Sequence, residues 1–437
     1  MKHVVKFITL GCKVNQYETN AMAQRFIENG YNIIEETEKE NANIEPDICI
    51  INTCTVTNMS DRKSRQMLRR MKEKNPKTII IAVGCYAQVA KEELSQMPEI
   101  DLILGNNEKV DIVKYVEEYI DGLKNEIEFD DVMKAKEFSD FGDITFSEKT
   151  RAVIKIQDGC DRFCSYCIIP YARGRVRSRK PESIISEITE ISKKGIKEVV
   201  ITGIHIASYG KDFKEDYKLI DLLEDINTID GIKRIRLGSI EPLLITNEFV
   251  ERLKKLEKIC HHFHLSLQSG CDDTLKRMNR RYTTGRFREI VQILRNEYQD
   301  VNLTTDIIVG FPGETEDEFN KTYNFLEEIK FYNMHIFKYS PRKGTKAAVM
   351  KNQIPGNIKE ERSKKLIELS NKNQLEYNKN YIGKEVEVLF EEEKNGIYKG
   401  HTQNYIVICC KTEEKLENKF KVVKCKNATD EYISAQL

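Results

Sequence analysis

The chain of 437 residues lacks an excess of either charge, because 70 basic residues balance 70 acidic ones and the formal net charge at pH 7 is zero. No global field therefore draws the protein to an acidic partner, and any binding of nucleic acid has to come from local basic patches. The sequence also lacks an apolar run of the roughly 18 residues that a membrane span requires. With 40% hydrophobic residues, the composition predicts a globular protein of about two to four domains that does not span a membrane.

A credible secretory signal is also lacking. The start, MKHVVKFITLGC, ends in Leu10-Gly11-Cys12 and looks like a lipoprotein cleavage site, but Lys6 interrupts an apolar run that is already too short for export. Without a signal, twelve cysteines in a chain of this length are more typical of metal ligands and buried thiols than of a disulfide framework. We therefore expect a cytoplasmic protein in a reducing compartment.

Residues 1–125 alternate short apolar runs with helical patterns. This alternation predicts an open parallel α/β sheet domain. The expected strands are Val4–Leu10, Asp47–Asn52, Thr78–Val83 and Asp101–Leu104. Residues 126–148 are acidic and irregular, so we interpret them as a linker.

Residues 149–375 contain six further β/α units, which predict a partial barrel, (β/α)6, of the TIM type. The expected strands are Ala152–Gln157, Glu198–Thr202, Arg234–Leu237, Phe263–Gln268, Leu303–Val309 and Met334–Tyr339. A charged helical stretch follows from Lys359 to about Asn378. The tail is assigned to residues 376–437. Its apolar and polar residues alternate with a period of two, which predicts a small all-β domain. The alternating runs are Glu385–Phe390, Tyr405–Cys410 and Phe420–Cys425.

A Cys-x3-Cys-x2-Cys motif directly follows the first barrel strand and consists of Cys160, Cys164 and Cys167. Three thiolates at this spacing can bind three irons of a [4Fe–4S] cluster and leave the fourth iron open for a substrate, as catalytic metal sites do. The alternative is a zinc site or a set of buried structural cysteines. On a barrel, the motif resembles the radical S-adenosylmethionine (SAM) superfamily. The resemblance implies that the open iron binds SAM and that the reduced cluster cleaves it to a 5′-deoxyadenosyl radical.

Distinctive residues also follow the other barrel strands, and in barrel enzymes the site lies at these carboxyl ends. Gly203 would let the backbone approach the cofactor, while Glu241 and Gln268 could hydrogen-bond its ammonium or ribose groups. For each residue alone, a role in a turn or cap is an equal alternative. The predicted SAM-binding residues are Gly203, His205, Ser239, Glu241 and Gln268.

Three more cysteines, Cys12, Cys54 and Cys85, each follow a predicted strand of the first domain. Ligands collect at this edge of an open parallel sheet, so the three thiols could meet and bind a second cluster. Gly11 and Gly84, each directly before a cysteine, favour this interpretation over the alternative of ordinary buried cysteines in an α/β core.

The order of these three parts resembles the methylthiotransferase family over nearly the whole chain, and the tail looks like the family's TRAM domain, notably at Gly400–Tyr405. The resemblance implies SAM and two [4Fe–4S] clusters as cofactors. It also implies that an auxiliary cluster on Cys12, Cys54 and Cys85 carries an added sulfide, which one SAM methylates. A second SAM, cleaved at the cluster of Cys160, Cys164 and Cys167, then supplies the radical that places the methylthio group on carbon.

Short motifs select a branch of this family. Gly11-Cys12-Lys13-Val14-Asn15 and Cys167–Gly174 look like the enzymes that act on N6-threonylcarbamoyladenosine at position 37 of tRNA. The isopentenyladenosine branch usually reads Gly-Cys-Gln-Met-Asn at the first site, and the branch that modifies a ribosomal-protein aspartate reads Gly-Cys-Pro-Lys-Asn. Lys13 and Val14 match neither, although both substrates remain alternatives.

An alternating basic stretch beside the cluster loop predicts RNA contacts, since basic side chains neutralise phosphates without reading sequence. These residues are Arg173, Arg175, Arg177 and Arg179, and Tyr405 of the tail is expected to stack on a loop base. A second basic group, Arg62–Arg70, has helical spacing and is equally well explained as a solvated face.

Two other classes stay open. One is a radical SAM enzyme that acts on a protein or small molecule, and the other is an RNA-binding protein whose clusters sense redox state. The expected partners are the tRNA anticodon loop and a reduced flavodoxin or ferredoxin as electron donor, with no membrane.

Overall fold

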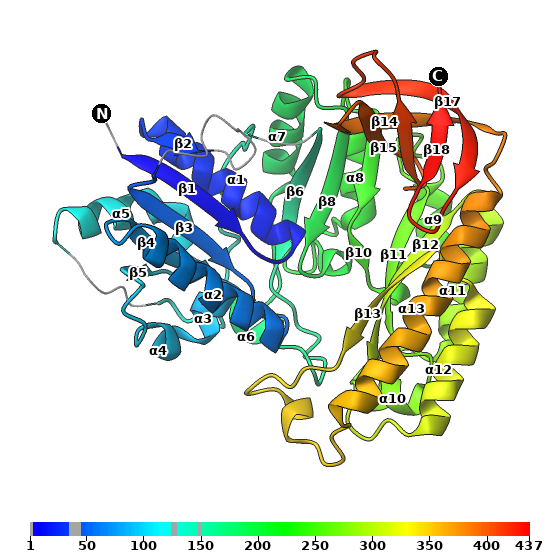
Figure 1. Cartoon of the computed structure of the whole chain (residues 1–437), viewed down its shortest axis with the longest axis horizontal. Helices are drawn as coiled ribbons and strands as arrows, with labels where there is room; N and C mark the ends of the chain where they lie inside the picture. Colours follow the sequence, from blue (N-terminus) through cyan, green and yellow to red (C-terminus); the bar gives the residue numbers. More distant parts are fainter. Residues whose placement is uncertain (1–2, 35–44, 124–128, 147–149) are drawn as a thin grey trace.

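The computed structural model describes residues 3–34, 45–123, 129–146 and 150–437 (Figure 1). The described residues form a parallel sheet, a partial barrel made of two sheets, and a closed barrel, and this order confirms the predicted fold class. Among the described residues, no helix combines the length and the apolar character that crossing a membrane requires.

The N-terminal domain is a five-stranded parallel sheet of order β2-β1-β3-β4-β5. All six residues of the central strand β3 are buried, which explains the apolar run of residues 48–51. Helices α1 and α5 pack on one face of the sheet, and α2 and α3 pack on the other. The elements are β1 (Val4–Thr9), α1 (Lys13–Glu28), β2 (Asn32–Ile34), β3 (Ile48–Thr53), α2 (Asn58–Lys74), β4 (Ile79–Gly84), α3 (Cys85–Val89), α4 (Lys91–Leu94), β5 (Leu102–Ile103), η2 (Glu108–Asp111) and α5 (Ile112–Ile120).

The second part contains the six predicted barrel strands as β6, β8, β9, β11, β12 and β13, with two short additional strands, β7 and β10. They form two sheets, of orders β7-β6-β8-β9 and β10-β11-β12-β13. A single bridge between Ile235 and Ile259 lies between β9 and β11. The strands are β6 (Arg151–Asp158), β7 (Arg177–Ser178), β8 (Glu198–Gly203), β9 (Arg234–Leu237), β10 (Ser239–Ile240), β11 (His262–Gln268), β12 (Asn302–Val309) and β13 (Asn333–Lys338).

Helices pack against one face of these sheets and form a large apolar core with the alternate strand residues that point toward them. The barrel strands leave their other face for the interior. The helical elements are α6 (Ile169–Arg173), α7 (Pro181–Lys193), η3 (Ile206–Ser208), α8 (Leu219–Asn227), η4 (Pro242–Leu244), α9 (Asn247–Leu253), α10 (Asp272–Arg277), α11 (Thr284–Glu297), α12 (Glu316–Ile329), η5 (Lys346–Val349) and α13 (Gly356–Lys379).

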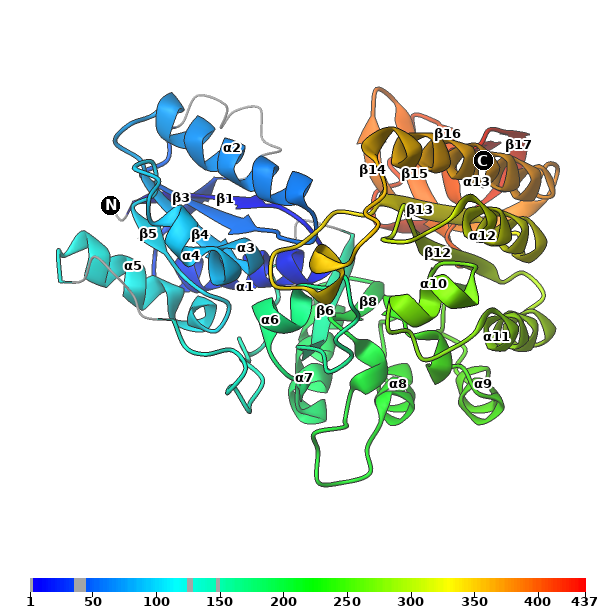
Figure 2. The ribbon, with the colours of Figure 1, turned by 90° about the horizontal axis from the view of Figure 1, so that it is seen from below.

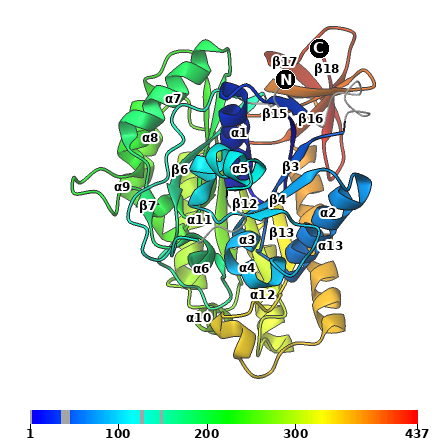
Figure 3. The same ribbon diagram turned by 90° about the vertical axis from the view of Figure 1, so that its left-hand side faces the viewer.

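The N-terminal domain covers the open side of this partial barrel, between β6 and β13. On one side α1 packs against β6 and β8, and Figure 3 shows it in front of the barrel strands. On the other side the segment after β13 runs to the N-terminal domain (Figure 2), where Arg342 forms an ion pair of 2.6 Å with Asp61. The loops that carry Cys12 and Cys54 therefore lie beside the barrel.

The C-terminal domain is a closed five-stranded barrel of order β14-β15-β16-β18-β17. It is anchored to the amino ends of the barrel strands, because Arg234 donates to the carbonyl oxygen of His401 at 2.9 Å and Arg236 to that of Gln403 at 3.2 Å. The strands are β14 (Glu385–Lys394), β15 (Ile397–Thr402), β16 (Val407–Lys411), β17 (Lys419–Ala428) and β18 (Ile433–Gln436).

Candidate active site

The loop between β6 and α6 carries Cys160, Cys164 and Cys167. Gly159 starts this loop with φ at 72°, and a Cβ there would lie 1.7 Å from the carbonyl oxygen of Arg175. Only glycine therefore lets the chain leave β6 in this direction. The backbone N–H of Cys160 then donates to the carbonyl oxygen of Gly174 at 3.0 Å, which fixes the start of the loop.

Protein groups surround these thiols. Burial raises the pKa of Cys160 to about 11, and burial together with the neighbouring Cys164 raises that of Cys167 to about 12. Arg280 donates to the sulfur of Cys164 at 3.3 Å. A metal has to displace the protons of these thiols when it binds, and the guanidinium group then faces the thiolate of Cys164.

The predicted SAM-binding residues divide into two sets. His205 and Glu241 lie together, with 3.4 Å between Nε2 and a carboxylate oxygen, and Arg280 links Glu241 to the cysteine loop at 3.1 Å. Gly203 ends β8 beside them. Ser239 is exposed at the start of β10, and Gln268 ends β11 in the left-handed region with φ at 72°. Within the described ranges, Arg280 therefore links Glu241, and through it His205, to the cysteine loop, whereas no hydrogen bond or ion pair links Ser239 or Gln268 to it.

Arg280 is a residue that the sequence analysis missed. It joins Cys164 to Glu241, and its guanidinium group also lies 4.9 Å from the ring centroid of Tyr282. Arg280 follows α10 and no strand, so the rule of looking at strand ends could not find it. A signal exists only in the pattern Arg280-Arg281-Tyr282, which also occurs on ordinary solvated surfaces.

The second set of cysteines also converges. Cys12 precedes α1, Cys54 follows β3 and Cys85 starts α3. A Cβ on Gly11 would lie 2.8 Å from the sulfur of Cys54, so this glycine is required for the close approach of the two loops. Burial raises the pKa of Cys12 and of Cys54, the latter to about 11, and the charge of Cys85 raises both further. The three thiols therefore face one another.

The spacing of the sulfurs discriminates between two kinds of metal site. Three thiolates on one tetrahedral zinc ion lie about 4 Å apart, given a Zn–S bond of about 2.3 Å. Among the residues described, neither cysteine set has all three sulfurs within 4.8 Å of one another. Each set instead offers three thiols, which is the number of protein ligands that a four-iron cluster with one open iron requires.

A buried network of charges links α6, the helix that follows the first cysteine loop, to the second cysteine set. Glu18 of α1 accepts from Lys109 at 2.5 Å, from Lys155 of β6 at 2.7 Å and from Arg173 of α6 at 3.0 Å. Burial alone would raise the pKa of Glu18, but the charges of Arg173, Lys109 and Lys155 hold it well below its ordinary value. Arg173 also donates from Nε to the sulfur of Cys85 at 3.2 Å. One side chain, six residues after Cys167, thus contacts both Glu18 and the second cysteine set.

This network corrects the prediction of RNA contacts. Arg173 and Arg179 are fully buried and Arg177 is 2% exposed, because they pair with acidic groups inside the protein. They have no surface to offer to a phosphate. Arg175 is different, since its side chain is 54% exposed. It forms an ion pair of 3.3 Å with Asp161, and its guanidinium group lies 4.9 Å from the ring centroid of Phe163.

Tyr405 is also not placed as expected. Its ring stacks on His401 and on His262, with centroid distances of 4.5 and 4.7 Å. The guanidinium group of Arg236 lies 4.6 Å from the ring centroid. Protein groups therefore already occupy the ring faces that a base would need, and Tyr405 closes the amino end of the barrel instead.

We expect Glu18→Gln to destabilise the protein strongly, because it removes the anion that three buried cations share. Breaking a buried ion pair from one side costs about 3–5 kcal/mol. The pKa of Glu18 is depressed in the folded state, so its contribution is present above the ordinary pKa of Glu and is lost only as the pH falls below it. The loss in the free energy of unfolding should therefore be constant from about pH 6 to pH 8.

Thermal melting of the full chain measures this loss, with the exposed Glu28→Gln on the same helix as control. Equal melting temperatures for the two variants would contradict the role of the network.

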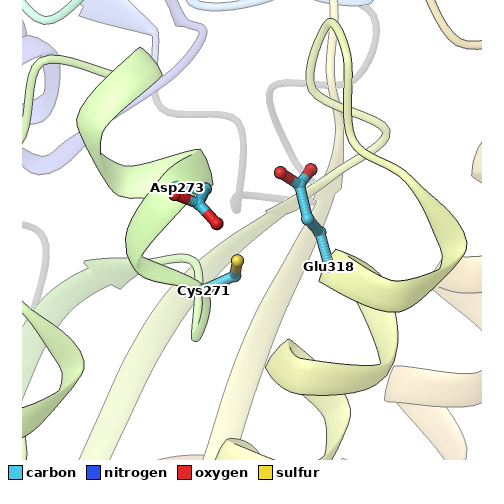
Figure 4. A group of neighbouring side chains, drawn as sticks. All are labelled: Cys271, Asp273 and Glu318. Carbon is cyan, nitrogen blue, oxygen red and sulfur yellow. The ribbon is translucent and has the colours of Figure 1, made fainter.

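A third group of possible ligands, Cys271, Asp273 and Glu318, has its ligand atoms within 4.8 Å of one another, and Figure 4 shows these side chains turned toward one another. Glu318, however, already accepts from Arg277 at 2.6 and 2.8 Å and caps α12 through the N–H of Thr315. We therefore interpret this group as an ion pair at a helix end and not as a metal site.

A partial barrel whose first strand leads into a three-cysteine loop, with an acidic and a basic group beside it, defines a radical SAM enzyme. Family comparisons agree with this class. Residues 154–326 match the radical SAM superfamily, and residues 4–105 match the uncharacterized protein family UPF0004.

Curated relatives cover the whole chain. A threonylcarbamoyladenosine tRNA methylthiotransferase MtaB from Bacillus subtilis is 41% identical over 99% of this chain and 96% of its own length, and the one from Aquifex aeolicus is 40% identical over 92% and 96%. A tRNA-2-methylthio-N(6)-dimethylallyladenosine synthase from Caldicellulosiruptor saccharolyticus is 36% identical over 98% and 91%. Among solved structures, the radical SAM methyltransferase TsrM from Kitasatospora setae has a TM-score of 0.59 at 14% identity and covers 80% of this chain and 77% of its own, which shows the fold alone.

The chain belongs to the radical SAM methylthiotransferase family, in its MtaB-type branch. It is a transferase, and its cofactors are SAM and two [4Fe–4S] clusters.

Proposed function

We propose that the protein methylthiolates C2 of N6-threonylcarbamoyladenosine at position 37 of tRNA. The observation that carries the proposal is the 41% identity over 99% of the chain with a threonylcarbamoyladenosine enzyme. The anticodon loop of tRNA is the partner that this substrate implies.

We assign the radical SAM cluster to Cys160, Cys164 and Cys167, and the auxiliary cluster to Cys12, Cys54 and Cys85. When bound, the first cluster supplies the electron that cleaves SAM, and the second holds the sulfur that is transferred. The chain's own groups orient these sites, because Arg280 contacts Cys164 and Arg173 contacts Cys85. His205 and Glu241, which lie next to Arg280, are the best placed of the predicted SAM-binding residues. Gly203, Ser239 and Gln268 remain in that set.

Arg175 is the predicted RNA-binding residue that the observed exposure supports. It lies beside the cysteine loop, and a phosphate there would add affinity without selecting a sequence. We further infer a cytoplasmic location, where tRNA is modified, and a reduced flavodoxin or ferredoxin as the electron donor. Both follow from the family resemblance.

Mass spectrometry of tRNA nucleosides from cells with and without this gene tests the proposal. Loss of the methylthio mark from threonylcarbamoyladenosine alone is the expected result. Loss of the methylthio mark from dimethylallyladenosine would instead assign the protein to the branch that modifies this nucleoside, as the 36% identity with such an enzyme allows. Unchanged tRNA nucleosides would contradict a tRNA substrate, and ribosomal proteins would then be analysed for a methylthio-aspartate.

A further inference from the structure

The segment that follows β13 contacts both cysteine sets. We call residues 339–350 the linking segment, and Figure 2 shows it between the N-terminal domain and the barrel. Its first part meets the chain just after Cys54, at the start of α2. Its second part meets the barrel loop between Cys164 and Cys167. One short stretch of chain therefore joins the surroundings of the two sets.

Arg342 makes the contact with the N-terminal domain. Its side chain is 7% exposed and donates to the hydroxyl of Thr55 at 2.5 Å and to the side-chain oxygen of Asn58 at 2.6 Å. The ion pair of 2.6 Å with Asp61 completes this contact, and Asp61 also accepts from Thr55 at 2.8 Å. Thr55 is fully buried and directly follows Cys54. One guanidinium group therefore fixes the backbone that leaves this cysteine.

Ala347 makes the contact with the barrel loop. Its backbone N–H donates to the carbonyl oxygen of Ser165 at 2.8 Å, and Ser165 lies between the second and third cysteines of that loop. Ala347 is fully buried in an apolar cluster with Phe311. The hydroxyl of Thr345 donates to the carbonyl oxygen of Arg342 at 2.7 Å, so a compact turn connects the two contacts.

The reaction depends on the relative position of the two cysteine sets. SAM is cleaved at the first set and the sulfur is held at the second, so one carbon of the substrate has to come close to both. The sets lie in different domains, and the contacts between these domains fix their separation. A displacement of reacting groups by about 1 Å can lower a rate by about 100-fold.

We propose that Arg342 is a positioning residue, which holds the loop of Cys54 at the distance from the barrel that transfer of the methylthio group requires. This inference rests on the proposed assignment of the clusters and adds a residue that acts through one of them. The ion pair and the side-chain hydrogen bonds of Arg342 lie in the N-terminal domain, so its replacement should leave the cleavage of SAM at the barrel loop unchanged.

Arg342→Lys tests the proposal, because lysine keeps the charge but cannot reproduce the several hydrogen bonds of the planar guanidinium group. The reduced full-length holoenzyme is supplied with SAM and with tRNA from cells that lack this gene. 5′-Deoxyadenosine and the methylthio product are measured in the same sample. We expect cleavage of SAM at the wild-type rate, while the ratio of methylthio product to 5′-deoxyadenosine falls by about 10- to 100-fold. A wild-type ratio would overturn the positioning role.

A double-variant cycle tests the contact itself. Asp61→Asn removes the same ion pair from the N-terminal side, so it should lower the product ratio as well. The variant that carries both Arg342→Lys and Asp61→Asn should lose no more than the more affected single variant, because both changes break one contact. Losses that multiply would show that the two residues act separately, which contradicts the proposal.

Electron paramagnetic resonance reports the position without turnover. Two reduced clusters interact magnetically, and this interaction weakens steeply as the distance between them grows. The spectrum of the reduced wild type should therefore be broader than that of Cys54→Ala, which keeps only the barrel cluster. Arg342→Lys should change this broadening at wild-type iron content, and an unchanged spectrum would contradict a displaced loop.

Arg362→Lys is the matched control. The side chain of Arg362 in α13 is 5% exposed, and it pairs with Glu314 at 3.3 Å and with Glu316 at 3.1 Å, so its ion pairs lie outside the N-terminal domain. The control should lose stability, as Arg342→Lys does, but it should keep the product ratio. An equal fall of the ratio in both variants would attribute the effect to general destabilisation and overturn the inference.

A milder variant covers the case that Arg342→Lys loses iron. Ser340→Ala removes the hydroxyl that accepts from the backbone N–H of Asn58 at 3.0 Å, and a smaller fall of the ratio is expected. If the wild type forms the product and both variants keep its ratio and spectrum, the positioning role is wrong while the proposed function stands. If Cys54→Ala retains the full iron content, the cluster assignment fails, and the inference fails with it.

Discussion

Cys160→Ala should abolish the formation of 5′-deoxyadenosine from SAM. A cluster that binds SAM through one open iron needs the other three irons held by thiolates, and Cys160, Cys164 and Cys167 are the three that the loop after β6 presents. We expect a complete loss, to the background of the assay, and a lower iron content. The measurement is chromatographic quantification of 5′-deoxyadenosine after anaerobic reduction with dithionite.

The matched control is Cys409→Ala, a partly exposed cysteine of β16 outside both sets. It should retain wild-type cleavage and iron content. Cleavage of SAM by Cys160→Ala at the wild-type rate would remove Cys160 from the ligands and reopen the alternative of structural cysteines.

Cys54→Ala should abolish the transfer of the methylthio group and leave the cleavage of SAM intact. The second cysteine set lies in a different domain from the loop after β6, so its loss leaves the site of SAM cleavage intact. We expect the iron content to fall to about half, because one of two four-iron clusters is lost. 5′-Deoxyadenosine should still form, whereas the methylthio product should be absent.

Iron and labile sulfide analysis, with product analysis by mass spectrometry on the same samples, measures this separation. Cys409→Ala again serves as the control. An iron content equal to that of the wild type would exclude Cys54 as a ligand. Retained methylthiolation with half the iron would instead contradict the assignment of the transferred sulfur to this set.

Much of the site could be predicted because parallel strands place their carboxyl ends at one edge. Each of the six cysteines follows a strand that a short apolar run predicts, so the local sequence was sufficient to group them into two sets of three. Five strands were missed, namely β2, β7, β10, β15 and β18. For β2, β7 and β10 the reason is their length, because segments of two or three residues have no measurable period.

The roles of the charged residues could not be predicted in this way. Arg173 pairs with Glu18 across 155 positions in the chain, and Arg342 reaches Asp61 from the far edge of the barrel. An arginine in a basic stretch has the same local sequence whether it faces a phosphate or a buried carboxylate. A charged residue within the apolar strand β6, Lys155, was a signal of such burial, since strands seldom enclose a charge without a partner.

The sequence by itself determined the order of the three parts, the two cysteine sets and the family to which they belong, because these depend on periodicity and on spacing along the chain. Only the tertiary structure decided that Arg173, Arg177 and Arg179 are internal and that the ring of Tyr405 stacks on His401 and His262. The physical reason is that burial and ion pairing depend on contacts between segments that are far apart in the sequence. In this protein the packing of the N-terminal domain against the open side of the barrel creates those contacts.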